Sequence, residues 1–157
     1  MRKPALLILV VGVLLAYCHR AITDDAGKDE AIKKERSKYE GTWRVDSLEV
    51  DGNKASDDDA RKITVINRID GTWVICIDGS ETYRGTSEID PTKKPKTIDF
   101  TPTEGDAAGM KHLGIYEIEE NTRRLCFAKP GQERPTEFSA PAGSGHLLVT
   151  FKREKSQ

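Results

Sequence analysis

The chain has 157 residues, of which 36% are hydrophobic and 32% are charged. This length and composition fit one globular domain plus a targeting segment, and they leave little room for a second domain. The formal net charge of −1 provides no strong field to attract nucleic acid, so we do not expect a nucleic-acid partner.

The first residues have the pattern of an export signal. Arg2 and Lys3 precede an apolar run over residues 5–17, and a positive segment followed by a short apolar one is typical of a signal peptide. A membrane-spanning helix needs about 20 apolar residues, so this run is short for an anchor. We therefore predict a signal peptide over residues 1–17 and a domain exported to the cell envelope or periplasm.

Cys18 follows this run directly. The window LAYC, residues 15–18, resembles the bacterial lipobox, in which cleavage leaves a lipid-modified cysteine as the new N-terminus. Tyr17 is a departure, because lipoboxes have Gly, Ala or Ser at that position. The resemblance implies a lipoprotein anchored to the membrane through Cys18. Ordinary secretion with cleavage nearby and an uncleaved anchor are the alternatives.

Within residues 18–38, the stretch over residues 22–38 is dense in charged side chains of both signs. The later part, from Asp29 to Tyr39, contains helix formers and few helix breakers. Glu30 also stands four residues before Lys34, which is the favourable order for a helical ion pair. The sequence predicts a tether followed by a short helix.

From Thr42 onward, short β-prone runs alternate with turn residues such as Asp70-Gly71. The pattern is typical of an all-β protein whose neighbouring strands are joined by tight turns. We predict eight strands, over residues 42–50, 62–69, 72–78, 81–89, 96–101, 111–119, 123–128 and 146–153. Because about eight antiparallel strands can close without open edges, residues 39–157 should form an eight-stranded up-and-down barrel.

Alternate residues along each strand should face the barrel interior. The apolar side chains of one parity are Trp43, Val45, Ile63, Val65, Trp73, Ile75, Ile77, Tyr116, Ile118, Leu125, Phe127, Leu147, Val149 and Phe151.

One connection is too long for a tight turn. Residues 129–145 form a stretch of 17 residues rich in Pro and Gly, and long loops in compact domains tend to be lids, binding edges or packed segments. Phe138 is its only aromatic residue. We interpret Phe138 as a plug that pins the loop against the barrel mouth, with contact to a ligand or partner protein as the alternative.

The triplet Gly41-Thr42-Trp43 resembles the Gly-X-Trp motif of lipocalin-like barrels. In that family the tryptophan closes one end of the barrel, and a basic residue from the last strand packs across its ring. Arg153 has the parity of Phe151 and offers such a residue. The resemblance therefore implies barrel-end closure by Trp43 and Arg153, in a cation–π contact of about 0.5–2 kcal/mol.

A broader resemblance covers most of the mature chain. Residues 40–52, 89–105, 113–145 and 151–154 are similar to an uncharacterised domain family found mainly in planctomycete bacteria. This resemblance implies a lipocalin-like fold and export. No catalytic residue can be carried over, because none is established in that family.

Candidate catalytic and metal motifs have poor spacing. The three histidines, at positions 19, 112 and 146, fit no zinc signature, and Gly143-Ser144-Gly145 lacks the spacing of a nucleophile elbow. The acidic run over residues 57–59 lacks the downstream glutamate of a calcium loop, so we interpret it as a solvated loop. We expect no catalytic residue, metal or cofactor.

Cys76 and Cys126 both lie in predicted strands. In an oxidising compartment they could form a disulfide if their Cα atoms come within about 7 Å. Buried free thiols, acting as small apolar side chains, are the simpler interpretation.

These features together favour a non-enzymatic, exported and lipid-anchored barrel that binds a small apolar ligand in the cell envelope. The alternative is a protein interaction module, such as an inhibitor of an envelope hydrolase, that uses residues 129–145 as its contact.

Overall fold

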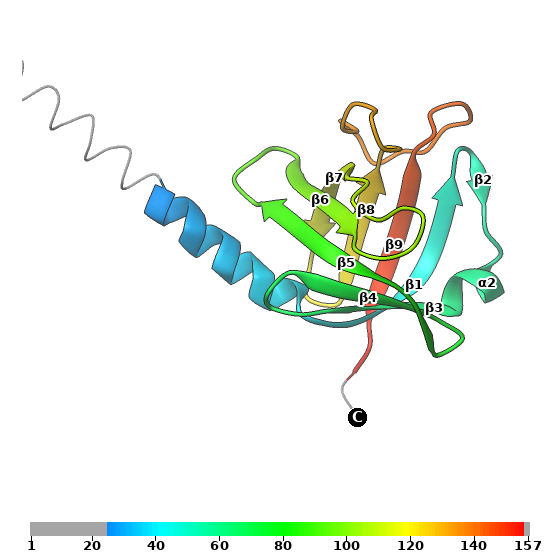
Figure 1. The fold of residues 1–157 in the computed structure, drawn as a ribbon, viewed down its shortest axis with the longest axis horizontal. Coiled ribbons are helices and arrows are strands. Elements are labelled where there is room, and N and C mark those ends of the chain that lie inside the picture. Colours follow the sequence, from blue (N-terminus) through cyan, green and yellow to red (C-terminus); the bar gives the residue numbers. More distant parts are fainter. Residues whose placement is uncertain (1–24, 156–157) are drawn as a thin grey trace, which may run out of the picture.

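The computed structural model describes residues 25–155, which form a closed antiparallel β-barrel with a helix on its N-terminal side (Figure 1). The predicted signal peptide, the lipidation site at Cys18 and the first part of the tether lie outside the described residues. In the part that is described, no helix combines the length and apolarity needed to cross a membrane.

The N-terminal helix covers residues 25–39, so it starts at least four residues earlier than the sequence predicts. The elements that follow are β1 (Gly41–Val50), β2 (Asn53–Lys54), α2 (Asp57–Arg61), β3 (Ile63–Asn67), β4 (Thr72–Ile77), β5 (Ser80–Asp90), β6 (Lys96–Pro102), β7 (His112–Ile118), β8 (Thr122–Phe127) and β9 (Leu147–Arg153).

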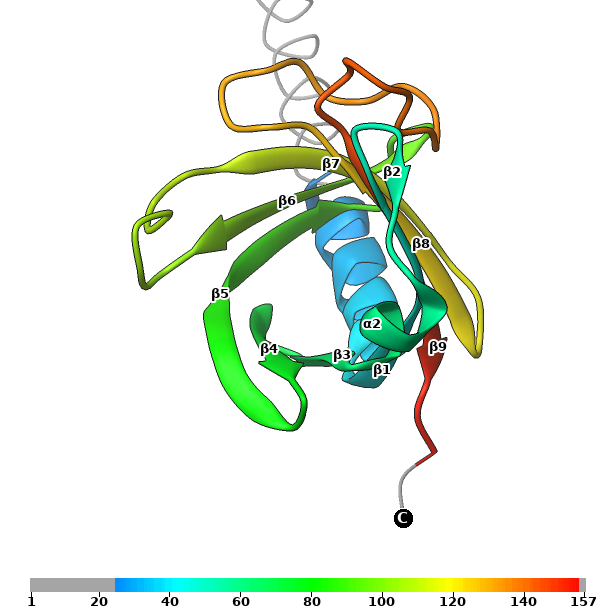
Figure 2. The same ribbon diagram turned by 90° about the vertical axis from the view of Figure 1, so that its right-hand side faces the viewer.

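The barrel closes because β9 returns to pair with β1. Sequential neighbours pair antiparallel from β3 to β9, β1 pairs with β3, and the β1–β9 ladder runs from Trp43 opposite Arg153 to Val50 opposite Leu147. Figure 2 shows this ring of strands with a strongly curved β5. The eight-stranded up-and-down barrel is thus confirmed, with β2 as an extra strand that pairs only with β1.

Two register shifts adjust which side chains face inward. On β1 the shift falls between Val45 and Ser47, opposite Phe151 and Thr150 of β9. A β-bulge of this kind inserts one residue and changes the alternation of the strand. As a result, Val45 and Leu48 both line the interior although they are three residues apart. The second shift lies between Ile75 and Cys76, where β4 pairs with β5.

The acidic run over residues 57–59 is the first turn of α2, so the expectation of a solvated loop was wrong. The Ser56 hydroxyl accepts a hydrogen bond from the backbone N–H of Asp59 at 3.2 Å and caps the helix. Negative side chains in a first turn are favourable, because backbone N–H groups there carry partial positive charge. Ala60 on the inner side of α2 is buried and packs against the core.

The N-terminal helix is fixed to the barrel along β5 and β6. Lys28 forms an ion pair with Asp90 at 2.9 Å, and Arg36 donates to the hydroxyl of Ser87 at 2.9 Å and to its carbonyl oxygen. Ile32 and Tyr39 pack into the core. The helix is therefore part of the folded unit as well as a connection to the residues before it.

Cys76 of β4 and Cys126 of β8 are free, buried thiols. The thiol of Cys126 donates to the carbonyl oxygen of Ser139 at 3.3 Å. The structure thus supports the interpretation of the two cysteines as buried free thiols.

A substitution at Gly114 of β7 tests the packing between β7 and β8. A Cβ at this position would overlap the ring of Phe127 and approach the carbonyl oxygen of Cys126 to 2.7 Å. We expect Gly114→Ala to lower the free energy of unfolding in urea by about 1–3 kcal/mol, as overpacked cores do. Gly27→Ala is the matched control, because nothing lies within 4 Å of its Cβ. Equal effects of the two substitutions would contradict this packing.

Candidate ligand-binding site

The barrel encloses an apolar cavity of about 270 Å³. Its walls come from strands on all sides of the barrel and include Val65, Ile75, Ile98, Leu125 and Val149. Small-molecule sites are typically concave, mostly apolar and a few hundred Å³ in volume. The interior is therefore wide enough for a small ligand and is not filled by side chains.

Most of the inward-facing residues predicted from the strand alternation line this cavity. Trp43 and Tyr116 are buried in the core beside it, and Ile118 packs against that core. The prediction of one apolar face is thus confirmed. It omitted Ile98 and Phe100 of β6 and Tyr83 of β5. It also omitted Leu48, whose orientation depends on the β1 bulge, and the polar residues described below.

One end of the cavity opens to solvent. Ile77, at the end of β4, is 36% exposed, and Tyr83, on β5, is 57% exposed, although both line the cavity. Apolar, partly exposed side chains therefore border the open end of the cavity.

The opposite end is closed around Trp43. This side chain is fully buried, and its indole N–H donates to the carbonyl oxygen of Tyr39 at 2.9 Å. The guanidinium carbon of Arg153 lies 4.1 Å from the centroid of the Trp43 ring. The structure thus brings Trp43 and Arg153 together at one end of the barrel.

Arg153 also connects three chain segments. Its guanidinium donates to the carbonyl oxygens of Glu40 at 2.8 Å and Lys38, and its Nε donates to the carbonyl oxygen of Glu120 at 2.9 Å. The side chain therefore ties β9 to the end of the N-terminal helix and to the β7–β8 turn.

A second arginine, Arg123 of β8, lies inside the barrel and is only 2% exposed. Its guanidinium carbon lies 4.7 Å from the ring centroid of Trp43, 4.8 Å from that of Tyr39 and 4.3 Å from that of Phe151. With the Asn67 amide turned so that its oxygen faces Arg123, both terminal nitrogens of Arg123 donate to that oxygen, at 3.0 and 3.2 Å. Arg123, Tyr39 and Asn67 all line the cavity at its closed end.

Two buried polar groups at this end have no hydrogen-bond partner within residues 25–155: Nε of Arg123 and the hydroxyl of Tyr39. Burial lowers the pKa of Arg123 to about 10, and the nearby charge of Arg153 contributes to this. Burial likewise raises the pKa of Tyr39 to about 12. At neutral pH Arg123 is therefore a cation, and the hydroxyl of Tyr39 is neutral.

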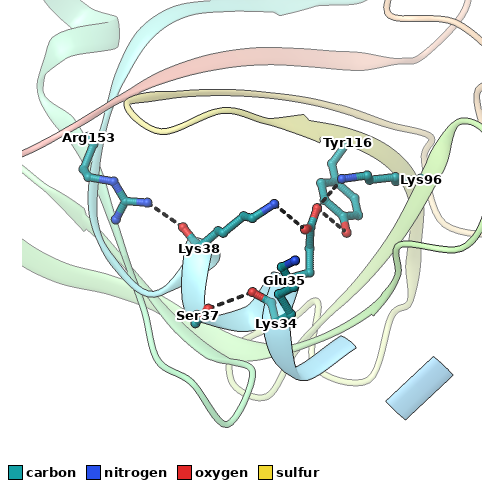
Figure 3. Close-up of polar contacts among 7 residues, drawn as sticks. All are labelled: Lys34, Glu35, Ser37, Lys38, Lys96, Tyr116 and Arg153. Carbon is teal, nitrogen blue, oxygen red and sulfur yellow. Dashed lines mark hydrogen bonds and ion pairs between the residues drawn. The ribbon is translucent and has the colours of Figure 1, made fainter. Parts of the chain in front are cut away.

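Glu35 is a buried carboxylate on the N-terminal helix, and Figure 3 shows the contacts around it. It pairs with Lys96 of β6 and with Lys38 at 3.2 Å, and it accepts a hydrogen bond from the hydroxyl of Tyr116 at 3.4 Å. Burial alone would raise the pKa of Glu35, but the hydrogen bonds and charges of Lys96 and Lys38 lower it overall. Burial and the Glu35 charge raise the pKa of Tyr116.

Phe138 lies away from the cavity. The guanidinium carbon of Arg124 is 4.4 Å from the centroid of the Phe138 ring, and the parity of β8 directs Arg124 outward because Arg123 and Leu125 face the interior. Phe138 is absent from the cavity lining. The expectation of a plug at the barrel mouth was therefore wrong, because the ring covers the outer surface of β8.

Across residues 25–155, no cluster of three or more His, Cys, Asp or Glu side chains is placed to bind a metal ion. Comparisons with protein-family models, curated proteins and solved structures give no significant match.

Replacing Arg153 tests the closed end of the barrel. Arg153→Met removes the hydrogen bonds to three carbonyl groups and the stacking on Trp43, so the free energy of unfolding should fall by about 1–3 kcal/mol. Lys152→Met is the matched control, because Lys152 is next to Arg153 and makes one surface ion pair, with Asp46. The control should lose at most about 1 kcal/mol. A loss no larger for Arg153→Met than for the control would contradict the role of Arg153.

Glu35 should make the stability of the protein depend on pH. Its pKa is lower in the folded protein than the ordinary value of 4.5, so folding favours the deprotonated form. The resulting stability is present above about pH 4.5 and is lost as the pH falls through the lowered pKa.

Glu35→Gln should lower the free energy of unfolding by about 1–3 kcal/mol at pH 7, and the difference from the original protein should shrink between pH 5 and 3. Urea unfolding at several pH values measures this difference. Glu30→Gln, an exposed position on the same helix, is the control. A pH-independent difference would show that the carboxylate charge is not the cause.

Proposed function

We propose that this protein binds a small apolar molecule in the interior of its barrel. The observation that carries the proposal is the cavity of about 270 Å³, with apolar walls and one open end. A side chain such as Val65 or Ile75 gains little from facing an unfilled space, whereas contact with a bound apolar molecule would stabilise both partners.

The affinity expected from such a cavity is moderate. A ligand that buries about 250 Å² of apolar surface gains about 6 kcal/mol at ~25 cal/mol per Å². Part of this gain is offset by the lost freedom of the ligand. Dissociation constants in the micromolar to millimolar range are therefore expected for an apolar molecule without specific polar contacts.

The setting that we propose is the cell envelope. A signal peptide over residues 1–17 and lipidation at Cys18 would place the barrel outside the cytoplasm on a membrane anchor, where apolar ligands are abundant. Export, the anchor and the resemblance to the family found mainly in planctomycete bacteria stay predictions from the sequence, as does the absence of enzymatic activity and of a cofactor.

A protein interaction module is the second candidate, and the packing of residues 129–145 favours a preformed contact surface. Within this loop the carbonyl oxygen of Ala140 accepts a hydrogen bond from Gly52 at 2.6 Å, and the N–H of Gly145 donates to Asp51 at 2.7 Å. These bonds hold the loop against the β1–β2 turn. A preformed surface would bind a partner without a large ordering cost.

A larger side chain in the cavity should block binding. We expect the purified protein to bind the neutral fluorophore N-phenyl-1-naphthylamine at one site, measured by fluorescence titration, and Val65→Phe to weaken binding roughly tenfold or more, because the added ring occupies the cavity. Ile66→Phe adds the same bulk one position along β3, where the side chain faces outward, and should bind as the original protein does. No binding by the original protein, or equal binding by both variants, would contradict the proposal.

A further inference from the structure

We propose that the ligand is an apolar molecule with a carboxylate at one end, and that this carboxylate pairs with Arg123 at the closed end of the cavity. This inference rests on the proposed function and adds the chemical class of the ligand. It follows from the polar groups that line an otherwise apolar space.

Arg123 is a buried cation without a matching anion. No ion pair joins it to a carboxylate within the described part of the chain, and Arg153 is a second cation at the same end. The nearby carboxylate of Glu35 is already paired with Lys96 and Lys38. The closed end of the cavity therefore has an excess of positive charge.

A buried charge is costly unless it is paired and hydrogen-bonded. The rings of Trp43, Tyr39 and Phe151 offset part of this cost through cation–π contacts, and Asn67 accepts two hydrogen bonds. A neutral amide oxygen does not balance the charge. The surrounding side chains thus fix the position of Arg123 but offset only part of the cost of burying its positive charge.

The two buried donors without a partner could both donate to one carboxylate. Nε of Arg123 and the hydroxyl of Tyr39 are both donors, both are buried, and neither has a partner within residues 25–155. A carboxylate has two oxygens and accepts hydrogen bonds only, and bonds from an arginine to a carboxylate are among the strongest in proteins. A ligand amine would meet repulsion at this end, and an alcohol would leave the charge unbalanced.

The arrangement also orients the ligand. Arg123 and Tyr39 line the cavity near the N-terminal helix, whereas Ile77 and Tyr83 line its exposed end. The side chains between them are largely aliphatic and aromatic. A hydrocarbon tail would therefore extend from Arg123 toward the open end, in the manner of a straight-chain fatty acid.

The test compares ligands that differ only at one end. We expect decanoate to bind the original protein roughly tenfold more tightly than decan-1-ol in calorimetric titrations at pH 7.5, where the carboxylate is ionised. Decylamine, which is a cation at this pH, should bind more weakly than decan-1-ol. All ligands are used below the concentrations at which they form micelles.

Arg123→Met keeps a long side chain and removes the charge, and it should abolish the preference for decanoate over decan-1-ol. Arg124→Met is the matched control, because this neighbour on β8 faces outward and stacks on Phe138. The control should keep the preference. A Tyr39→Phe variant removes only the unpartnered hydroxyl and should reduce the preference roughly threefold, which provides a readout even if Arg123→Met does not fold.

Each result separates the two proposals. Equal binding of decanoate and decan-1-ol by the original protein would overturn the carboxylate inference and leave apolar binding intact. A preference that is as large in Arg123→Met as in the original protein or, where that variant does not fold, as large in Tyr39→Phe would overturn the placement of the carboxylate at the closed end. Absence of binding by decanoate, decan-1-ol and the neutral fluorophore would overturn the proposed function itself.

Discussion

The return of β9 to pair with β1 is the constraint on which the rest of the structure depends. Without the ladder from Trp43–Arg153 to Val50–Leu147, the sheet would have two open edges and one apolar face exposed to water. Closure turns that face into an interior, so that alternate side chains of every strand point toward a common space. Eight strands make this space slightly too wide for side chains such as Val65 and Val149 to fill, and a cavity remains.

The two ends of the cavity differ because different elements meet there. At the closed end, the N-terminal helix brings Tyr39 and Glu35 against the barrel, while β8 and β9 supply Arg123 and Arg153. The aromatic rings exclude water and make direct cation–π contacts with both arginines. The other end has apolar, partly exposed side chains instead. A cavity that is charged at one end and apolar at the other suits an amphipathic molecule better than a wholly apolar one. This difference is the reason that we propose to place the carboxylate of the ligand at the closed end.

The alternation of apolar residues was sufficient to predict eight strands and most of the cavity wall, because one parity of six of the strands carries large aliphatic or aromatic side chains. The polar lining was not predicted. Arg123 has the same parity as Leu125 and Phe127, so the strand alternation alone would place its side chain inside the barrel. Because charged residues are seldom buried, Arg123 was not included among the interior residues. The inward orientation of Leu48 was not predicted because it results from the β1 bulge. The helix α2 was not predicted either, and it begins at the Ser56 cap. Phe138 was misplaced because the sequence does not tell which surface a long loop covers.

Crystallography under xenon pressure tests most directly whether the closed barrel is hollow. Xenon enters apolar cavities without requiring a particular ligand, so the result does not depend on the identity of the natural one. We predict a xenon atom among Val65, Ile75 and Leu125, with Arg123 still at the closed end beside Trp43. An interior filled by collapsed side chains, with no xenon bound inside the barrel, would contradict it.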